Sequence, residues 1–307
     1  MKIIHAPQDL RPQGRKICLA IGFFDGVHLG HQQIVRQTIG NARQHEAISL
    51  VITFDRHPNA IVAPDRVPLL IYSLPQKLRA IEALGVDTLL LIHFDKQFSQ
   101  QTGEAFIRGL ARDLGALQSI CVGANFVFGH KRGGDVELLK KLGEELRFTV
   151  HGLAAVALDG KAVSSTRVRQ AIQAGELDAA SQMLGRAYSL AGNVVRGDGL
   201  GKQLGFPTAN VDVKGLVLPP RGVYAVQAEA DNRTWRAVLN IGIRPTLQNP
   251  NPQMQVEAHL LDFQGDLYDH QLEITFVEKL REEKKFGSLT DLRDQIARDI
   301  QEAQLRI

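Results

Sequence analysis

The sequence predicts an α/β domain followed by a small all-β domain that closes with a helix. In the first half, short apolar runs alternate with amphipathic stretches of helical period. After about residue 188 the pattern changes to short strand-like runs separated by clusters of Gly, Pro and Asn. A chain of 307 residues has room for two domains of ~150 residues each. We therefore predict one domain at 1–185 and a second at 186–307.

The elements of the first half alternate along the chain. Strands are expected at 17–22, 48–54, 88–94, 119–122 and 148–157, with helices at 31–44, 74–84, 104–114 and 135–146. Two shorter helical pieces are expected at 168–174 and 177–184. Alternating strands and helices favour a parallel sheet covered by helices on both faces. Ligands of such sheets bind beyond the carboxyl ends of the strands.

The second half carries strand-like runs of a different spacing. Strands are expected at 189–195, 222–230, 236–240, 255–261 and 271–276, with turns at 219–220 and 249–252. This pattern is typical of a small closed barrel. Ser288 and Asp291 resemble a capping box that starts a final helix. Its apolar stripe is expected to cover the barrel and consists of Leu289, Leu292, Ile296 and Ile300.

Composition narrows the class of protein. A net charge of +3 suits phosphate-bearing ligands but is too small to indicate nucleic-acid binding, and 6% aromatic residues offer no stacking platform. Cys18 and Cys121 lie in apolar runs and are expected to be buried thiols, which suits a reducing cytoplasm. No apolar run approaches the ~20 residues of a membrane span, and no signal peptide is visible at the start. We expect a cytoplasmic monomer or weak oligomer that binds neither nucleic acid nor membranes.

The first chemical motif, Gly22–His31, follows the first strand and opens a helix. His28 and His31 lie on one helical turn, where free backbone N–H groups and the helix dipole favour anions. Hydroxyls and arginines at 163–169 start another helix and suit the β- and γ-phosphates of ATP. Such groups fit nucleotidyl transfer, which needs charge stabilisation and in-line geometry. The alternative is an ordinary half-buried histidine pair, and a zinc site is disfavoured because two ligands are too few. The predicted ATP residues are Gly22, Phe23, Asp25, Gly26, His28, His31, Ser164, Ser165, Thr166 and Arg169.

The second motif is the glycine-rich loop 197–205, which leads into Phe206–Asn210. It is no Walker A loop, because its glycine and lysine spacing differs. Thr208 and Asn210 are two apart on an extended segment, so both face one side and offer oxygen ligands to phosphate-bound Mg²⁺. The alternative is a tight turn with ordinary Thr and Asn turn chemistry. The predicted ATP residues here are Gly199, Lys202, Gly205, Pro207, Thr208 and Asn210.

Together these motifs resemble a known family over essentially the whole chain. An HxGH sequence followed later by SSTxxR resembles the HxGH nucleotidylyltransferase superfamily. Residues 53–58 and 122–135 look like the N-terminal module of prokaryotic bifunctional riboflavin kinase/FAD synthetases. The second half is similar to the riboflavin kinase barrel at 222–225, 240–246, 256–259, 266–268 and 280–286. The resemblance implies a Rossmann-like adenylyltransferase domain and a Greek-key-type kinase barrel.

The resemblance also implies the chemistry and further residues. The barrel would phosphorylate riboflavin with ATP to FMN, and the first domain would adenylylate FMN with ATP to FAD and pyrophosphate, both with Mg²⁺. Glu257 corresponds to the kinase base, and Arg169 joins His28 and His31 in the adenylyl site. FMN would contact His57, Pro58, Asn125 and Phe128, although Asn125 stands where many relatives have Asp and core packing is an alternative for Phe128. Riboflavin would contact Arg281 and Phe286, although Arg281 would equally suit a solvated position.

The sequence is compatible with three other functions. The first is an enzyme with a single activity, in which the other half of the chain serves only folding or regulation. The second is a nucleotidylyltransferase that acts on a different phosphorylated substrate. The third is a flavin-binding or interaction protein without catalytic activity. A class I aminoacyl-tRNA synthetase is disfavoured, because no KMSKS-like segment is present.

Overall fold

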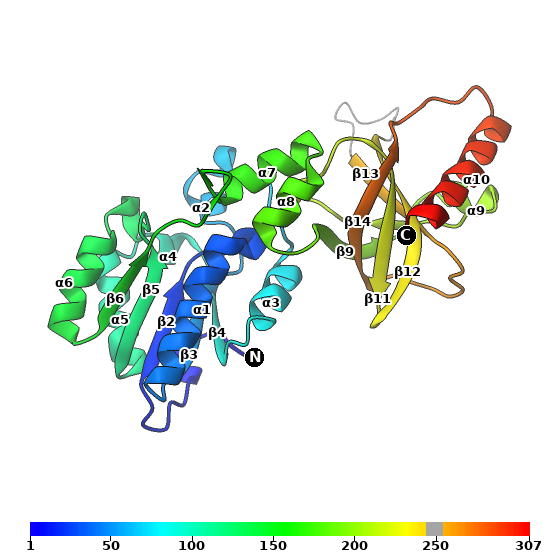
Figure 1. The fold of residues 1–307 in the computed structure, drawn as a ribbon. Helices are drawn as coiled ribbons and strands as arrows, with labels where there is room; N and C mark the ends of the chain where they lie inside the picture. Colours follow the sequence, from blue (N-terminus) through cyan, green and yellow to red (C-terminus); the bar gives the residue numbers. More distant parts are fainter. Residues whose placement is uncertain (244–253) are drawn as a thin grey trace. The chain divides into compact units, whose positions relative to one another are not determined.

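The computed structural model describes residues 1–243 and 254–307 and divides the chain into two compact units (Figure 1). The first unit comprises Met1–Leu69 and Leu74–Ser165, and the second comprises Leu70–Ser73 and Thr166–Ile307. The expected turn at 249–252 and the family-like segment 244–246 lie outside the described residues. Among the helices described, none is long and apolar enough to span a membrane.

A parallel sheet forms the centre of the first unit. Its strands are β1 (Lys2–Ile4), β2 (Ile17–Ile21), β3 (Ile48–Phe54), β4 (Thr88–Ile92), β5 (Leu117–Gly123) and β6 (Thr149–Leu153). Their order in the sheet is β1-β4-β3-β2-β5-β6, and every neighbouring pair is parallel. All carboxyl ends therefore meet at one edge, as the alternating sequence pattern predicts. The expected strand at 148–157 is shorter, because it ends at Leu153 and Ala157 already belongs to a small hairpin. The Val163 N–H closes this hairpin by donating to the Val156 carbonyl at 2.8 Å.

Helices cover both faces of this sheet, as predicted (Figure 1). Alternate residues of β2 point to opposite faces, which is the pleat of a strand. Ile17 and Leu19 pack with the helix that carries Ile107, whereas Ala20 packs with the helix that carries Val35. The main helices of the unit are α1 (Leu29–Gln44), α3 (Leu74–Glu82), α5 (Gly103–Leu114) and α6 (Val136–Leu146). Shorter elements are η1 (Pro7–Asp9), η2 (Asp25–Val27), α2 (Asn59–Val62), η3 (Pro64–Arg66), α4 (Lys96–Ser99), η4 (His130–Arg132), β7 (Ala157–Leu158) and β8 (Lys161–Ala162).

The second unit contains a closed antiparallel barrel, which confirms the predicted all-β fold. Its strands are β9 (Ser189–Val195), β10 (Ala209–Val211), β11 (Gly222–Ala230), β12 (Arg233–Ile243), β13 (Met254–Leu260) and β14 (Gln271–Arg281). Their order is β10-β13-β12-β11-β14-β9. Along β13, Val256 and Ala258 are buried in the barrel. Glu257 and His259 therefore face outward, because side chains alternate along a strand.

Helices α7 (Ser165–Ala174) and α8 (Leu177–Leu184) precede the barrel, α9 (Leu200–Gln203) lies between β9 and β10, and α10 (Leu289–Arg306) follows the last strand. The boundary between the two compact units lies between Ser165 and Thr166 and not at 185–186, so α8 belongs to the barrel unit. The Ser288 hydroxyl accepts the Asp291 N–H at 3.1 Å, as the expected cap requires. The predicted apolar stripe is wrong at its first position, because Leu289 is 61% exposed. The residues that pack α10 on the barrel's outer face are Ile300, Ala303 and Ile307, against Val223, Ala225 and Val238.

A short segment interrupts the first unit and packs in the second. We call Leu70–Ser73 the strap. The Leu70 N–H donates to the Gly215 carbonyl at 2.7 Å, and the Leu70 carbonyl accepts the Val217 N–H at 2.8 Å. Ile71 is fully buried, and the Tyr72 hydroxyl accepts Arg186 Nε at 3.0 Å. The strap is therefore an integral part of the barrel unit.

Candidate active sites

The two motif histidines lie at the N-terminus of α1. His28 is the N-cap, and its Nδ1 accepts the His31 N–H at 3.4 Å. The two rings are stacked, with centroids 3.6 Å apart. The His31 ring also makes a T-shaped contact with the Phe24 ring, with centroids 5.2 Å apart, so aromatic packing fixes the pair. The first turn of a 16-residue helix thus carries two imidazoles where its backbone favours an anion.

The turn between β2 and α1 follows an unusual backbone path. Phe24, Gly26 and Val27 all have positive φ, at 55°, 71° and 43°. For the β-branched Val27 this conformation is strained, and such strain gathers at functional sites. A Cβ on Gly22 would lie 2.9 Å from the Phe24 ring, so the turn needs glycine there. Asp25 is 3% exposed, and its carbonyl accepts the Ser165 hydroxyl at 3.2 Å.

The SSTxxR residues straddle the division of the chain. Ser164 and Ser165 belong to the first unit, and the contact with Asp25 brings Ser165 to the histidine turn. Thr166 and Arg169 lie in the first turns of α7 and belong to the second unit. The geometry within the first unit therefore joins the two motifs through Ser165.

The predicted flavin residues of the first unit follow the strands next to β2. The His57 ring makes a T-shaped contact with the Phe23 ring, with centroids 4.8 Å apart, and His57 Nδ1 accepts the Asn59 N–H at 3.1 Å. Pro58 is the N-cap of α2, just after β3. Asn125 follows β5 in the sequence. His57 and Asn125 thus come from the same edge of the sheet as the histidine pair.

Phe128 packs into the first unit. Its ring stacks on Phe126 at 5.3 Å, and both side chains are partly buried against the core. The backbone of Phe128 exchanges two 2.9 Å hydrogen bonds with Gly134. A Cβ on Gly134 would lie 2.9 Å from the Phe128 ring. Core packing thus accounts for both phenylalanines, and Phe128 as a flavin contact stays a prediction.

Lys77 is a buried group of this region that the sequence reasoning missed. Its Nζ donates to the Phe54 carbonyl at 2.7 Å and the Phe23 carbonyl at 3.2 Å. Burial lowers the pKa of Lys77 to about 8, and the charges of Asp25 and Asp55 oppose the shift. One signal was present in the sequence, because Lys77 occupies the apolar face of the helix that begins at Leu74.

Asp55 anchors the loop after β3 to the end of β4. Its carboxylate accepts the Phe94 N–H at 3.1 Å and lies 2.6 Å from His93 Nδ1. Burial alone would raise the pKa of Asp55, but these two hydrogen bonds and the nearby Arg56 charge lower it instead. The carboxylate is therefore ionised near neutral pH and holds its loop in place.

In the second unit, the glycine-rich loop folds back on the segment that follows it. The Phe206 N–H donates to the Gly201 carbonyl at 2.8 Å. A Cβ on Gly201 would lie 2.5 Å from the Phe206 carbonyl and 3.0 Å from the Thr208 hydroxyl. Gly199 and Gly205 have φ of 72° and 89°. The predicted loop thus depends on glycine for close approach and for left-handed backbone.

Glu257 lies in a row of polar side chains on the outer face of the barrel. It pairs across the sheet with Asn210 of β10 on one side and with Asn240 of β12 on the other. Directly paired residues of antiparallel strands point to the same face. His259 is on the same face as Glu257, and its Nδ1 lies 2.8 Å from the carbonyl oxygen of Pro207. Register thus brings the predicted metal ligand Asn210 and the predicted base Glu257 together.

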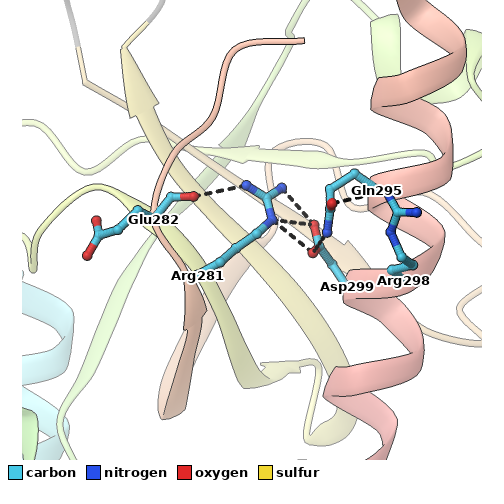
Figure 2. A network of polar contacts seen from close by, with 5 residues as sticks. All are labelled: Arg281, Glu282, Gln295, Arg298 and Asp299. Atoms are coloured by element: carbon cyan, nitrogen blue, oxygen red, sulfur yellow. Dashed lines mark hydrogen bonds and ion pairs between the residues drawn. The ribbon is translucent and has the colours of Figure 1, made fainter.

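Arg281 is committed to a buried ion pair (Figure 2). Its Nε and terminal nitrogen donate to both carboxylate oxygens of Asp299, at 2.7–3.1 Å. The Asp299 carboxylate also accepts Gln295 Nε2 at 2.8 Å. The Arg281 and Asp299 side chains are 14% and 4% exposed, which rules out the solvated alternative for Arg281. The guanidinium lies 5.8 Å from the centroid of the Phe286 ring.

Comparison with protein families matches each unit to a family of its own. The model of the FAD synthetase family matches residues 10–167. The model of the riboflavin kinase family matches residues 184–307.

Curated relatives match almost the whole chain. A bifunctional riboflavin kinase/FMN adenylyltransferase of Pseudomonas fluorescens is 38% identical over 99% of this chain and 97% of its own length. A protein of the same description from Escherichia coli K12 is 37% identical over 97% of this chain and 96% of its own.

A solved structure shares the fold over the whole chain. A crystal structure titled as a macrolide-efflux protein of Streptococcus pneumoniae has a TM-score of 0.82 at 28% identity, covering 98% of each chain. That description concerns the Streptococcus pneumoniae protein. The common architecture therefore extends through both units.

Proposed function

The chain belongs to the family of bifunctional riboflavin kinase/FMN adenylyltransferases, and we propose from this premise which residues perform each of the two reactions. The barrel unit phosphorylates riboflavin with ATP, giving FMN and ADP. The parallel-sheet unit joins FMN to the adenylyl group of a second ATP, giving FAD and pyrophosphate. The observation that carries the residue assignment is the cross-strand register that places Glu257 beside Asn210.

In the adenylyltransferase, His28 and His31 bind the phosphates of ATP at the start of α1. An FMN phosphate oxygen attacks the α-phosphorus, forming the new P–O bond as the bond to pyrophosphate breaks. Because the protein offers no covalent nucleophile in this scheme, catalysis comes from positioning and from stabilising the charge on the phosphates. The stacking of the two rings supports a common target for them.

Further residues complete the adenylyltransferase in this proposal. The remaining ATP contacts come from Gly22, Phe23, Asp25, Gly26, Ser164, Ser165, Thr166 and Arg169. Arg169 and the hydroxyls of 164–166 bind the β- and γ-phosphates, which depart as pyrophosphate. FMN is bound through His57, Pro58, Asn125 and Phe128. The contact between Phe23 and His57 supports neighbouring ATP and FMN sites.

In the kinase, Glu257 accepts the proton of the ribityl 5′-hydroxyl as the hydroxyl oxygen attacks the γ-phosphorus of ATP and the bond from that phosphorus to ADP breaks. A positioned base contributes ~10²–10⁴-fold to such a step. ATP is bound by the loop through Gly199, Lys202, Gly205 and Pro207. In this proposal Phe286 contacts riboflavin directly. Arg281 acts on riboflavin indirectly, because its guanidinium is paired with Asp299 and lies 5.8 Å from the centroid of the Phe286 ring.

Mg²⁺ fits the residues of the kinase loop. Thr208 and Asn210 offer neutral oxygens, which hard cations prefer, and phosphate oxygens would supply the negative charge. The backbone of the glycine-rich loop approaches the Thr208 hydroxyl closely, since a Cβ on Gly201 would lie 3.0 Å from this oxygen, so the loop and the proposed ligand lie side by side. When bound, the ion would neutralise charge on the triphosphate. Among the residues that the structure describes, no group of three or more His, Cys, Asp or Glu side chains is arranged to hold a metal.

The wider setting follows from the same proposal. The protein acts in the cytoplasm as a monomer or weak oligomer on riboflavin, FMN and ATP, without nucleic acid or membrane partners. Its adenylyltransferase domain occupies 1–185 and its kinase domain 186–307, although α7 and α8 pack with the barrel unit.

Chromatography of flavins tests the assignment. Glu257→Gln is expected to abolish FMN formation from riboflavin but to spare FAD formation from supplied FMN. His28→Ala with His31→Ala is expected to let FMN accumulate without FAD. If both activities fall together in a folded Glu257→Gln variant, the assignment of separate sites is wrong. Flavin binding without ATP turnover by the native protein would instead indicate a binding protein.

A further inference from the structure

Lys77 is a charged group in an apolar setting. Among the lysines that the structure describes, it alone is buried, with 3% of its surface exposed. Its ammonium has a full set of partners, namely the Phe54 carbonyl at 2.7 Å, the Phe23 carbonyl at 3.2 Å and the Thr53 hydroxyl at 3.3 Å. An ammonium has three protons to donate, so the site is matched to lysine.

These partners lie where two neighbouring strands end. The backbone ladder between β2 and β3 runs up to the Gly22 N–H, which donates to the Ile52 carbonyl at 3.1 Å. Beyond this point, the Thr53 hydroxyl donates to the Phe23 carbonyl at 3.0 Å, and Lys77 bridges the Phe23 and Phe54 carbonyls. Lys77 thus extends the link between the strands past the end of their ladder.

The same ammonium acts on the Phe23 ring. It lies 4.2 Å from the ring centroid, which is a cation–π contact. The ring meets His57 with its centroid 4.8 Å from the imidazole's. A chain of contacts therefore runs from Lys77 through Phe23 to His57, from the proposed ATP turn to the proposed FMN segment.

We propose that Lys77 is a positioning residue of the adenylyltransferase, which fixes the ATP turn at 22–28 against the FMN segment at 55–58. The inference rests on the proposed function of this site. Lys77 touches neither substrate in this scheme, because its ammonium is buried under the backbone that it binds. In-line transfer needs the FMN phosphate oxygen to be aligned with the α-phosphorus of ATP. A misplacement of about 1 Å lowers the rate of such a reaction by ~10²-fold.

The setting of Lys77 argues against a role in stability alone. Burying an ammonium is unfavourable, and burial lowers the pKa of Lys77 despite the opposing charges of Asp25 and Asp55. An apolar side chain of similar length would pack there without that penalty. A lysine at this position is thus better explained by the geometry that its three donors impose.

Lys77→Met tests the proposal, because methionine keeps the length of the side chain but has no donors. FAD formation from FMN and ATP is measured by steady-state kinetics, and riboflavin phosphorylation is measured on the same sample. Lys140→Met is the matched control, since Lys140 belongs to the same unit, is 53% exposed and pairs only at the surface with Glu137. Far-UV circular dichroism during heating reports folding.

We expect Lys77→Met to raise the KM for FMN and for ATP in FAD formation and to lower kcat/KM about 10–100-fold. Riboflavin phosphorylation and the Lys140→Met control are expected to stay within about twofold of the native protein. An unchanged kcat/KM for FAD formation in folded Lys77→Met would overturn the proposal. A fall in kcat that only matches the loss of folded protein, with unchanged KM values, would also overturn it, because partial unfolding lowers only the number of active molecules.

Thr53→Val decides the matter if Lys77→Met does not fold. This variant removes one partner of Lys77 and one bond to Phe23, and we expect the same rise in KM at smaller size. Unchanged KM values in folded Thr53→Val would then refute the positioning role. Failure of the proposed function looks different, because the native protein itself would form no FAD, or the His28 and His31 variants would still form it.

Discussion

The buried pair of Arg281 and Asp299 permits a sharp prediction about the barrel unit. Asp299→Ala would leave the Arg281 guanidinium buried without the carboxylate that neutralises it (Figure 2). Removing one partner of a buried ion pair destabilises a protein by about 3–5 kcal/mol. Asp299→Asn keeps the shape and one acceptor oxygen. We therefore expect Asn to reduce the free energy of unfolding by about 2–3 kcal/mol, in line with the loss of a charged hydrogen bond.

The assay can follow the barrel unit alone. Trp235 is the single tryptophan of the sequence and lies on β12, so its fluorescence reports the barrel during heating or urea denaturation. In a unit of this size, a loss of 3 kcal/mol lowers the midpoint of thermal unfolding by roughly 10 °C.

An exposed ion pair of the same helix supplies the control. Arg306 bonds Glu278 at 2.8 Å, but both side chains are about half exposed, at 45% and 46%. Arg306→Gln should therefore change the free energy of unfolding by about 1 kcal/mol at most. Arg281→Met combined with Asp299→Leu removes both charges and should recover most of the loss. The reasoning fails if the double variant is as unstable as Asp299→Ala, or if Arg306→Gln is equally damaging.

Three further predictions concern other parts of the chain. Between pH 8 and 10, the native protein should gain about 2–3 kcal/mol in the free energy of unfolding relative to Lys77→Met, since the unfolded chain still holds a proton that folded Lys77 releases near pH 8. Urea unfolding across this pH range measures the gain, and a constant difference would contradict it. Gly201→Ala should raise the KM for ATP about tenfold in riboflavin phosphorylation, because its Cβ would lie 2.5 Å from the Phe206 carbonyl. FAD formation from FMN is the control, and an unchanged kinase KM would refute the effect. Ile71→Ala should destabilise the barrel unit by about 2–4 kcal/mol in Trp235 fluorescence, because Ile71 is fully buried. A loss as small as that of Val277→Ala, at a barrel site 44% exposed, would show that the strap contributes little.

Much of the fold follows from local sequence pattern. Apolar runs with β-branched residues predict β3 at its observed bounds, Ile48–Phe54, because a strand covered on both faces has no polar side. The outward position of Glu257 follows from the alternation along β13. The apolar stripe of α10 predicts which side of the helix faces the barrel. It does not predict how many turns of the helix contact the barrel. Leu289 is exposed because periodicity along a helix carries no information on where the partner surface ends.

The candidate sites were predictable in residue type and less so in position. His28 and Asn210 were predictable because a short motif carries each of them. Lys77 was missed because a lysine on a helix is normally solvated, and only its place on the apolar face marked it. The partner of Arg281 was not predictable, since the contact with Asp299 depends on how α10 packs on the barrel.

The strap was also invisible to local reasoning, and it has a consequence for how the chain can be divided. Leu70–Ser73 is translated before any strand of the barrel. The strap can therefore pack in its unit only after the barrel strands have been synthesised. A gene cut between Ser165 and Thr166 would give a second product without Ile71 and Tyr72, although both are buried in that unit. Separating the two units into independent proteins thus requires more than a single cut, because part of the interior of the barrel unit is encoded within the sequence of the first unit.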